Sequence, residues 1–143
     1  MADQGYAGLN RSIEKTNQML THIEEAYGWP RDRRRQSFAA LRAVLHALRD
    51  RLTVYEAADL AAQLPLVVRG LYYEGWSPSK VPIKMHRDEF LDRVGREFPF
   101  DIEGGRETLI ERVLQAVRRF VTPGEWDHIR SSLPRDLVEL LPS

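Results

Sequence analysis

The 143-residue chain contains no cysteine. This absence excludes a disulfide framework, a thiolate metal site and a cysteine nucleophile, and it fits a reducing compartment. The chain also lacks net charge, because 21 basic side chains balance 21 acidic ones. The balance holds locally, with 10 Lys and Arg against 9 Asp and Glu in residues 1–75, and 11 against 12 in residues 76–143. Neither half therefore has the positive field that non-specific binding to nucleic acid or to an anionic membrane requires.

Long hydrophobic runs are missing as well. The longest apolar run is Leu64–Val68, far below the roughly 20 residues of a membrane-spanning helix. The first residues, Met1 to Tyr6, have neither a basic start nor an apolar stretch, so they do not form a secretory signal. We therefore expect a cytoplasmic protein with no membrane partner.

What the chain does contain is an internal repeat. When Val44–Leu71 is shifted by 69 positions onto Val113–Leu140 without gaps, nine of the 28 aligned pairs are identical. Four further pairs exchange one apolar residue for another. The matches fall mostly on core-type positions and on helix caps, such as Thr53 with Thr122, which indicates two diverged copies of one helical unit.

Apolar spacing predicts the helices of the first unit. A first helix runs from about Ser12 to Tyr27, and a second follows Asp32, its expected N-cap, and ends near Leu52. One seam of the second helix has the spacing 3-4-3-4, and its members are Phe38, Leu41, Leu45, Leu48 and Leu52. We expect all five side chains to be buried.

Two matching capping boxes follow, Thr53–Glu56 and Thr122–Glu125. In such a box the threonine oxygen accepts from the glutamate amide, and the glutamate side chain accepts from the threonine amide. A third helix is expected after each box. Pro65 and Pro134 then stand at matching points and predict a sharp turn into a short fourth helix.

Together these patterns predict an all-α fold. We expect a single compact helical bundle of roughly eight helices, formed by two tandem, diverged repeats with pseudo-two-fold symmetry, in which the second and sixth helices meet at the centre. The expected boundaries are a flexible N-terminus over 1–11, a first unit over 12–73, an aromatic and proline-containing linker over 74–85 and a second unit over 86–143. All four segments belong to one domain.

Several strings of the first unit carry a family resemblance. They are Leu41-Arg-Ala-Val-Leu-His-Ala-Leu-Arg-Asp-Arg-Leu52, Glu56-Ala-Ala, Ala62-Gln-Leu-Pro65 and Arg69-Gly-Leu-Tyr-Tyr-Glu-Gly-Trp76. With these strings the chain resembles the bacterial domain of unknown function 2267 family, from about Asn10 to its end. The resemblance implies an all-helical bacterial cytosolic protein. It implies no activity, cofactor or catalytic residue.

One aromatic cluster has no counterpart in the second unit. Its members, with one arginine, are Arg69, Tyr72, Tyr73 and Trp76. Because Tyr, Trp and Arg dominate interaction hot spots, these residues are candidates for binding a protein partner. The alternative is that the rings plug the seam between the two units and keep only their polar tips at the surface.

A basic cluster marks the start of the second helix, and it consists of Arg31, Arg33, Arg34 and Arg35. Arginines beside helix N-terminal amides are candidates for holding a phosphate or an acidic peptide. The alternative is a solvated helix end whose arginines pair with Glu24 and Glu25.

Other chemistry has no signature in this sequence. The four histidines are scattered without the spacing of a zinc site, and no glycine loop for phosphate or Gly-x-Ser-x-Gly motif occurs. We expect His46 to be a boundary histidine with local hydrogen bonds, although a haem ligand is an alternative at its position beside the seam. We expect no catalytic residue, no metal site and no cofactor.

Three functions remain open. The leading hypothesis is a non-catalytic protein-interaction or regulatory module, including a homodimer, that uses an apolar groove near Tyr72–Trp76. The second is a small-molecule or cofactor sensor that binds its ligand between the two units. The third is nucleic-acid binding through Arg31–Arg35. An enzyme ranks below all three.

Overall fold

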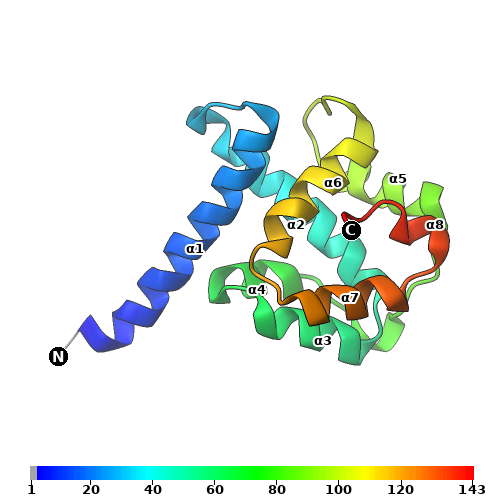
Figure 1. Ribbon diagram of the computed structural model, residues 1–143, viewed down its shortest axis with the longest axis horizontal. Coiled ribbons are helices and arrows are strands. Elements are labelled where there is room, and N and C mark those ends of the chain that lie inside the picture. The colour runs from blue at the N-terminus through cyan, green and yellow to red at the C-terminus, as the bar shows by residue number, and fades with distance from the viewer. Residues whose placement is uncertain (1–2) are drawn as a thin grey trace.

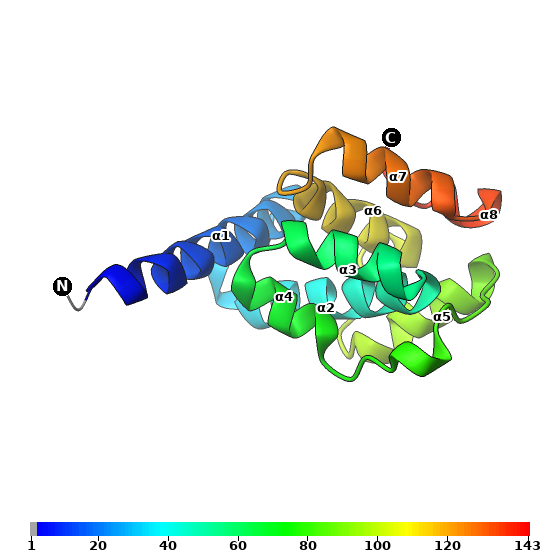
Figure 2. The same cartoon turned by 90° about the horizontal axis from the view of Figure 1, so that it is seen from below.

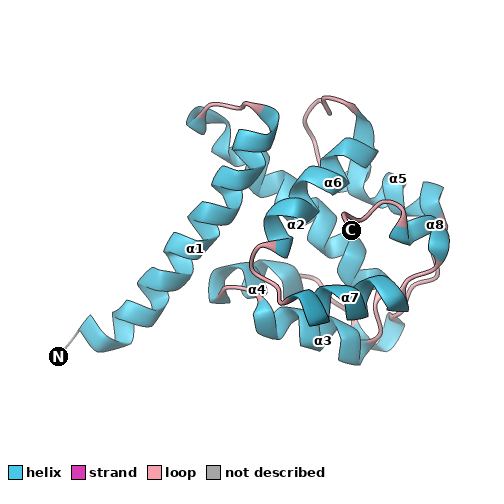
Figure 3. Ribbon diagram, in the orientation of Figure 1, coloured by secondary structure: helices cyan, strands magenta, loops and turns pink. Residues whose placement is uncertain are grey.

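In the computed structural model, which describes residues 3–143, the chain is helical throughout (Figure 3). The described residues form eight α-helices and no strand. In chain order the elements are α1 (Asp3–Tyr27), the 3-10 turn η1 (Arg31–Arg33), α2 (Arg34–Arg51), α3 (Val54–Gln63), α4 (Leu66–Tyr73), the 3-10 turn η2 (Pro78–Lys80), α5 (Arg87–Glu97), α6 (Gly105–Arg118), α7 (Pro123–Ser132) and α8 (Arg135–Val138). This confirms the predicted all-α bundle. No helix among residues 3–143 combines the length and apolar character that crossing a membrane needs.

Helix α2 lies at the centre of the body and packs against α1, α4, α5 and α6 (Figures 1 and 2). The contact between α2 and α6 is the central contact expected from the sequence. Across the molecule, α1 packs on α6 while α5 packs on α2, and α3 packs on α7. An internal two-fold axis predicts this arrangement, in which the first helix of each unit packs on the second helix of the other unit. The symmetry of the two units itself stays a prediction.

The apolar seams of α2 and α6 build the core. Leu41, Leu45, Leu48 and Leu52 of the first seam are fully buried. In α6 the buried set is Leu109, Ile110, Val113, Leu114, Ala116 and Val117. The third helices add their predicted faces, with Leu60 on α3 and Trp126 on α7 both buried.

The prediction for Phe38 is wrong, because its side chain is 40% exposed. Phe38 lies in the first turns of α2, where the inward position belongs to its neighbour Ser37. The Ser37 hydroxyl donates to Glu24 Oε2 at 2.6 Å, so a buried polar contact ends the apolar seam at this turn.

One predicted helix start and one predicted helix cap are also wrong. Helix α1 begins at Asp3 rather than near Ser12, so the part of the expected flexible terminus that falls in residues 3–11 is helical, and residues 1–2 lie outside the described residues. Gly5 and Gly8 weaken the helix signal there, but the apolar stripe of α1 continues through them. At the second start, Asp32 lies within η1 and α2 begins at Arg34 without a side-chain cap.

The two capping boxes have different outcomes. Thr53 and Glu56 form the complete box, with Thr53 N donating to Glu56 Oε1 at 2.9 Å and Glu56 N donating to Thr53 Oγ1 at 3.2 Å. In the second, Glu125 N donates to Thr122 Oγ1 at 3.2 Å, but Thr122 N donates to Gln63 Oε1 at 2.7 Å instead. The second box is therefore half formed, because the end of α3 occupies the amide that Glu125 was expected to bind.

The turns at Pro65 and Pro134 lead into α4 and α8, as predicted. The linker between the units contains η2 and a cis peptide bond between Val81 and Pro82. Ile83 N donates to Asp50 O at 2.7 Å, so the end of the linker is attached to the last turn of α2.

Candidate functional site

The aromatic residues of the first unit are only partly at the surface. Tyr72 is fully buried, and its hydroxyl donates to Ala57 O at 3.0 Å. Burial, reinforced by the neighbouring Tyr73, raises the pKa of Tyr72 far above its usual value. Tyr72 is therefore a core residue and offers no surface to a partner.

Arg69 is occupied by the end of α3. Its Nε donates to Ala61 O at 2.8 Å, and its Nη2 donates to Leu64 O at 3.2 Å and to Ala62 O at 3.3 Å. These carbonyls are the ones that a helix C-terminus leaves without intrahelical partners, and a guanidinium there also complements the helix dipole. Arg69 thus caps a helix.

Tyr73 and Trp76 keep part of their ring surface exposed. The Tyr73 ring centroid lies 5.2 Å from that of Tyr72 and 5.1 Å from that of Trp76, which makes a chain of three packed rings. A plug at the seam between the two units stays a prediction, because these contacts join the rings only to one another. A hot-spot role stays a prediction for Tyr73 and Trp76.

Two of the four arginines in the basic cluster form ion pairs within the described part of the chain, and two do not. Arg34 binds Glu24 with Nε to Oε2 at 3.0 Å and Nη2 to Oε1 at 2.9 Å, and Arg33 Nη1 binds Glu103 Oε1 at 3.1 Å. Arg31 and Arg35 are exposed. The four arginines therefore do not converge on one ligand position, since two of them bind carboxylates of the chain itself.

Glu24 is the acidic centre of this end of the bundle. Its burial alone would raise the pKa of the carboxyl group, but the hydrogen bonds from Arg34 and Ser37 and the charge of Arg34 outweigh that effect, so the pKa of Glu24 is lowered. The Glu24–Arg34 pair joins α1 to the start of α2. The alternative reading of the sequence expected the arginines to pair with Glu24 and Glu25, and this is the pairing with Glu24.

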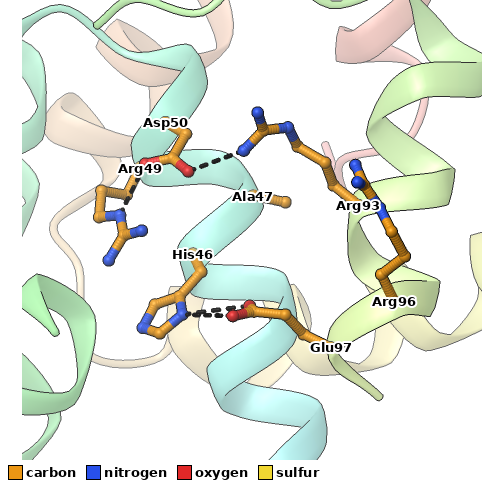
Figure 4. Close-up of a pocket in the computed structure, with 7 residues that line it drawn as sticks. All are labelled: His46, Ala47, Arg49, Asp50, Arg93, Arg96 and Glu97. Carbon is orange, nitrogen blue, oxygen red and sulfur yellow. Dashed lines mark hydrogen bonds and ion pairs between the residues drawn. The ribbon is translucent and has the colours of Figure 1, made fainter. Parts of the chain in front are cut away.

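A polar cluster that the sequence did not reveal lies between α2 and α5 (Figure 4). It consists of His46, Arg49 and Asp50 from α2, and Arg93 and Glu97 from α5. Asp50 binds Arg49 Nε through Oδ1 and Arg93 Nη1 through Oδ2, both at 2.9 Å. The sequence signal was weak, because the burial of these side chains depends on α5, which is more than forty residues away in the chain.

His46 and Arg49 are also fastened to the end of α4. His46 Nε2 lies 2.8 Å from Leu71 O, while its Nδ1 lies 3.1 Å from both carboxylate oxygens of Glu97. Arg49 Nη1 donates to Tyr72 O at 2.9 Å and to Glu74 O at 2.6 Å. His46 is therefore buried and bridges the two units, where a boundary position with local bonds was expected.

The cluster borders a small open cavity of about 240 Å³ that Arg96 also lines. In Figure 4 the side chains of His46, Asp50 and Glu97 face bonding partners, whereas Arg96 has none drawn. Among residues 3–143 no group of three or more His, Asp or Glu side chains is placed to hold a metal ion. The arrangement is one of mutually satisfied ion pairs that join the two units.

A group of exposed apolar side chains lies elsewhere, where α1 leaves the body. We call residues 3–11 of α1 the arm. Tyr6 is 61% exposed, Leu9 41% and Ile13 44%, and on the start of α4 Leu66 is 57% exposed and Val67 37%. Hereafter these five side chains are the arm surface. The start of α4 meets α1 next to Ile13, since Val67 N donates to Ser12 Oγ at 2.8 Å.

The sequence did not single out the arm surface, although its spacing i, i+3, i+7 was readable in Tyr6, Leu9 and Ile13. An apolar stripe of this kind does not by itself distinguish a buried face from an exposed one.

Comparison with known protein families identifies the family of this chain. The model of a family described as "Uncharacterized conserved protein (DUF2267)" matches residues 16–140. No curated protein matches the chain. The matched range covers nearly all of both predicted units and leaves out the whole arm.

Proposed function

We propose that this chain, which belongs to the DUF2267 family of uncharacterized conserved proteins, is a non-catalytic interaction module that pairs with a second copy of itself. The observation that carries the proposal is the exposed apolar arm surface. A cytoplasmic location belongs to the same proposal, and the absence of cysteine agrees with it.

The arm has little support from the rest of its own chain. Figures 1 and 2 both show the first part of α1 projecting away from the body. Further along the same helix Met19 and Ile23 are fully buried, whereas every residue from Tyr6 to Arg11 is exposed. Burial of exposed apolar surface is favourable by about 25 cal/mol per Å². The arm therefore gains stability from any partner that covers its apolar stripe.

A second copy fits the shape of this surface. The arm surface has a projecting part, Tyr6, Leu9 and Ile13, and a part on the body, Leu66 and Val67. In a two-fold pair each arm lies along the body of the other copy, so one contact occurs twice and all five side chains of each copy are covered. The chain has no net charge, so long-range repulsion does not oppose self-association.

The expected affinity is modest. Each of the five side chains is already partly covered, so its burial contributes less than the about 1.5–3 kcal/mol of a fully exposed leucine-sized side chain. Association itself costs at least about 4 kcal/mol in lost translational and rotational freedom. We therefore expect a dissociation constant on the order of micromolar.

The polar residues of the body support a non-catalytic role. Both ring nitrogens of His46 have partners, and Asp50 bridges two arginines, so these groups act as structural contacts between α2 and α5. The nucleic-acid alternative has less support, because Arg33 and Arg34 bind carboxylates within the chain.

The test measures the mass of the full chain in solution by sedimentation equilibrium over a range of concentrations. The variant Leu9→Glu/Ile13→Glu places two carboxylates in the stripe, and we expect it to be monomeric at concentrations where the natural sequence is dimeric. Two isolated charges in an apolar contact weaken association by several kcal/mol, or at least about 100-fold.

Tyr55→Glu is the matched control, since Tyr55 is an apolar side chain on α3 that is 84% exposed and lies outside the arm surface. It should dimerise like the natural sequence. If the protein with its natural sequence stays monomeric at about 1 mM, the proposal is contradicted, and a second copy is not the partner of the arm surface. A dimer that persists in the double variant also contradicts it.

A further inference from the structure

We propose that a cavity between the end of α2, the residues before α5 and the start of α8 binds a phosphate dianion, either free or as the phosphate group of a small organic molecule. We call it the phosphate cavity. It measures about 600 Å³ and lies on the body, so the inference is independent of the arm surface. A volume of this size is within the range of small-molecule sites, roughly 300–1,000 Å³.

Three cations from three separate segments line the phosphate cavity: Arg51 from α2, Lys84 from the linker and Arg135 from α8. None of the three has an ion-pair partner within the described part of the chain. Arg51 Nε is shielded from solvent and has no hydrogen-bond partner among residues 3–143. A buried donor without an acceptor is costly, so the folded chain by itself leaves the hydrogen-bonding capacity of Arg51 unsatisfied.

The two carboxylates of the phosphate cavity are already engaged elsewhere. Glu89 Oε1 accepts from His86 N at 3.1 Å, and Asp136 Oδ2 accepts from Arg87 N at 3.1 Å. Asp136 Oδ2 also lies 3.8 Å from His86 Nδ1, and neither carboxylate forms an ion pair with Arg51, Lys84 or Arg135. Both carboxylates keep their negative charge, so the three cations of the cavity exceed them by one charge.

The positive charge continues along α5. A neighbouring cavity of about 500 Å³ shares Lys84 and Glu89 with the phosphate cavity and is also lined by Arg93, Arg96 and Arg106. Arg93 pairs with Asp50 at 2.9 Å and Arg106 with Asp92 at 2.8 Å. Arg96 has no ion pair within the described chain and adds to the field that draws an anion towards Lys84.

Phosphate matches this set of donors better than a single-charge anion does. A phosphate monoester carries about −1.5 to −2 charges at pH 7 and three strong acceptor oxygens, and a guanidinium binds two of these oxygens side by side. Met85 and Pro134 provide an apolar wall beside the cations, which suits the organic part of a small phosphate ester. The sequence could not show this site, because the three cations come together only when α8 returns to the end of α2.

The test is a calorimetric titration of the full chain at low ionic strength with three probes: phenyl phosphate, inorganic phosphate and benzenesulfonate. We expect both phosphates to saturate one site and the monoanionic sulfonate to bind at least about tenfold more weakly. Tighter binding of phenyl phosphate identifies an organic phosphate as the occupant, and equal binding of both phosphates identifies free phosphate. Added NaCl should weaken binding.

Lys84→Gln and Arg135→Gln should each weaken phosphate binding about tenfold or more, since each removes a charged hydrogen bond. Arg118→Gln is the matched control, because Arg118 is exposed on α6 and lines none of these cavities, and it should bind like the natural sequence. Amide shifts of the natural sequence on adding phosphate, concentrated at Lys84 and Arg135, test the site even if a variant fails to fold. No saturable binding up to about 10 mM phosphate overturns the proposal, as does binding that is equal in the two cavity variants and the control.

Discussion

Arg49 and Arg118 occupy matching positions in α2 and α6, yet Arg49 is 4% exposed and Arg118 lies on the surface. Arg49 reaches Tyr72 O and Glu74 O because α4 has eight residues and ends beside it. Helix α8 has only four residues, and Arg118 meets no such carbonyls. Two regions with the same pattern of apolar residues can therefore differ in a buried polar contact, because a neighbouring helix is longer in one region than in the other.

At apolar positions the two regions are alike. Leu45 and Leu114 are both fully buried, and the third helices bury Leu60 in one region and Ile129 in the other. The two regions therefore agree at these core positions, and substitutions at matched positions measure where they differ.

The largest effect is expected at the matched leucines. Leu45→Ala and Leu114→Ala should each lower the free energy of unfolding by about 2–5 kcal/mol, because each removes buried methyl groups and leaves a cavity. Urea denaturation of both variants checks this. A nearly neutral result for one member of the pair would break the claim that the two positions are equivalent.

A smaller and unequal effect is expected at the matched arginines. Arg49→Met should cost about 2–4 kcal/mol, because it leaves two carbonyl groups and part of Asp50 without a donor in a buried place. Arg118→Met should change stability by no more than about 0.5 kcal/mol, as exposed substitutions do. The same denaturation assay compares the two. Similar losses in both variants would contradict the difference described above.

The smallest effect concerns the two capping boxes and depends on pH. Glu56 binds Thr53 N, whereas the Oε2 atom of Glu125 is shielded and has no partner in the described chain. Burial, followed by the charge of Asp59, raises the pKa of Glu125 above its usual value. The folded state therefore holds this proton more tightly than the unfolded state, and the contribution of Glu125 to stability falls as pH rises through the raised pKa.

Glu125→Gln should remove this loss and flatten the dependence of stability on pH between about pH 4 and pH 7. Urea denaturation at both pH values measures it, with Glu111→Gln on the exposed face of α6 as the control. An unchanged pH profile in Glu125→Gln would show that the Glu125 carboxyl titrates as it does in the unfolded chain.

The parts of the fold that the sequence predicts correctly are those that depend on neighbouring residues. The seam from Leu41 to Leu52, the cap at Thr53 and the turn at Pro65 each depend on residues within one or two helical turns, and all three are confirmed. Phe38 and the start of α1 were predicted incorrectly. At Phe38 a polar contact with α1 replaces the apolar seam, and in the arm an apolar stripe outweighs two glycines.

The candidate sites were less accessible to sequence reasoning. Tyr72 and Arg69 have the residue types of a hot spot, but the first is in the core and the second caps α3. The sequence showed which types of side chain are present, but it did not show whether they are buried or which groups they bind. The polar cluster and the phosphate cavity combine residues that are more than forty positions apart in the chain, so no spacing in the sequence indicates them.

The sequence by itself determined the all-helical fold, the capping box at Thr53, the turns at the two prolines and the apolar faces that form the core, because these depend on propensity and periodicity over a few neighbouring residues. The tertiary structure alone decided which polar groups are buried together and which apolar groups stay exposed. Arg49 and Arg118 are the same residue in the same pattern. One is buried because α4 and α5 surround it, and the other is exposed because no helix covers it.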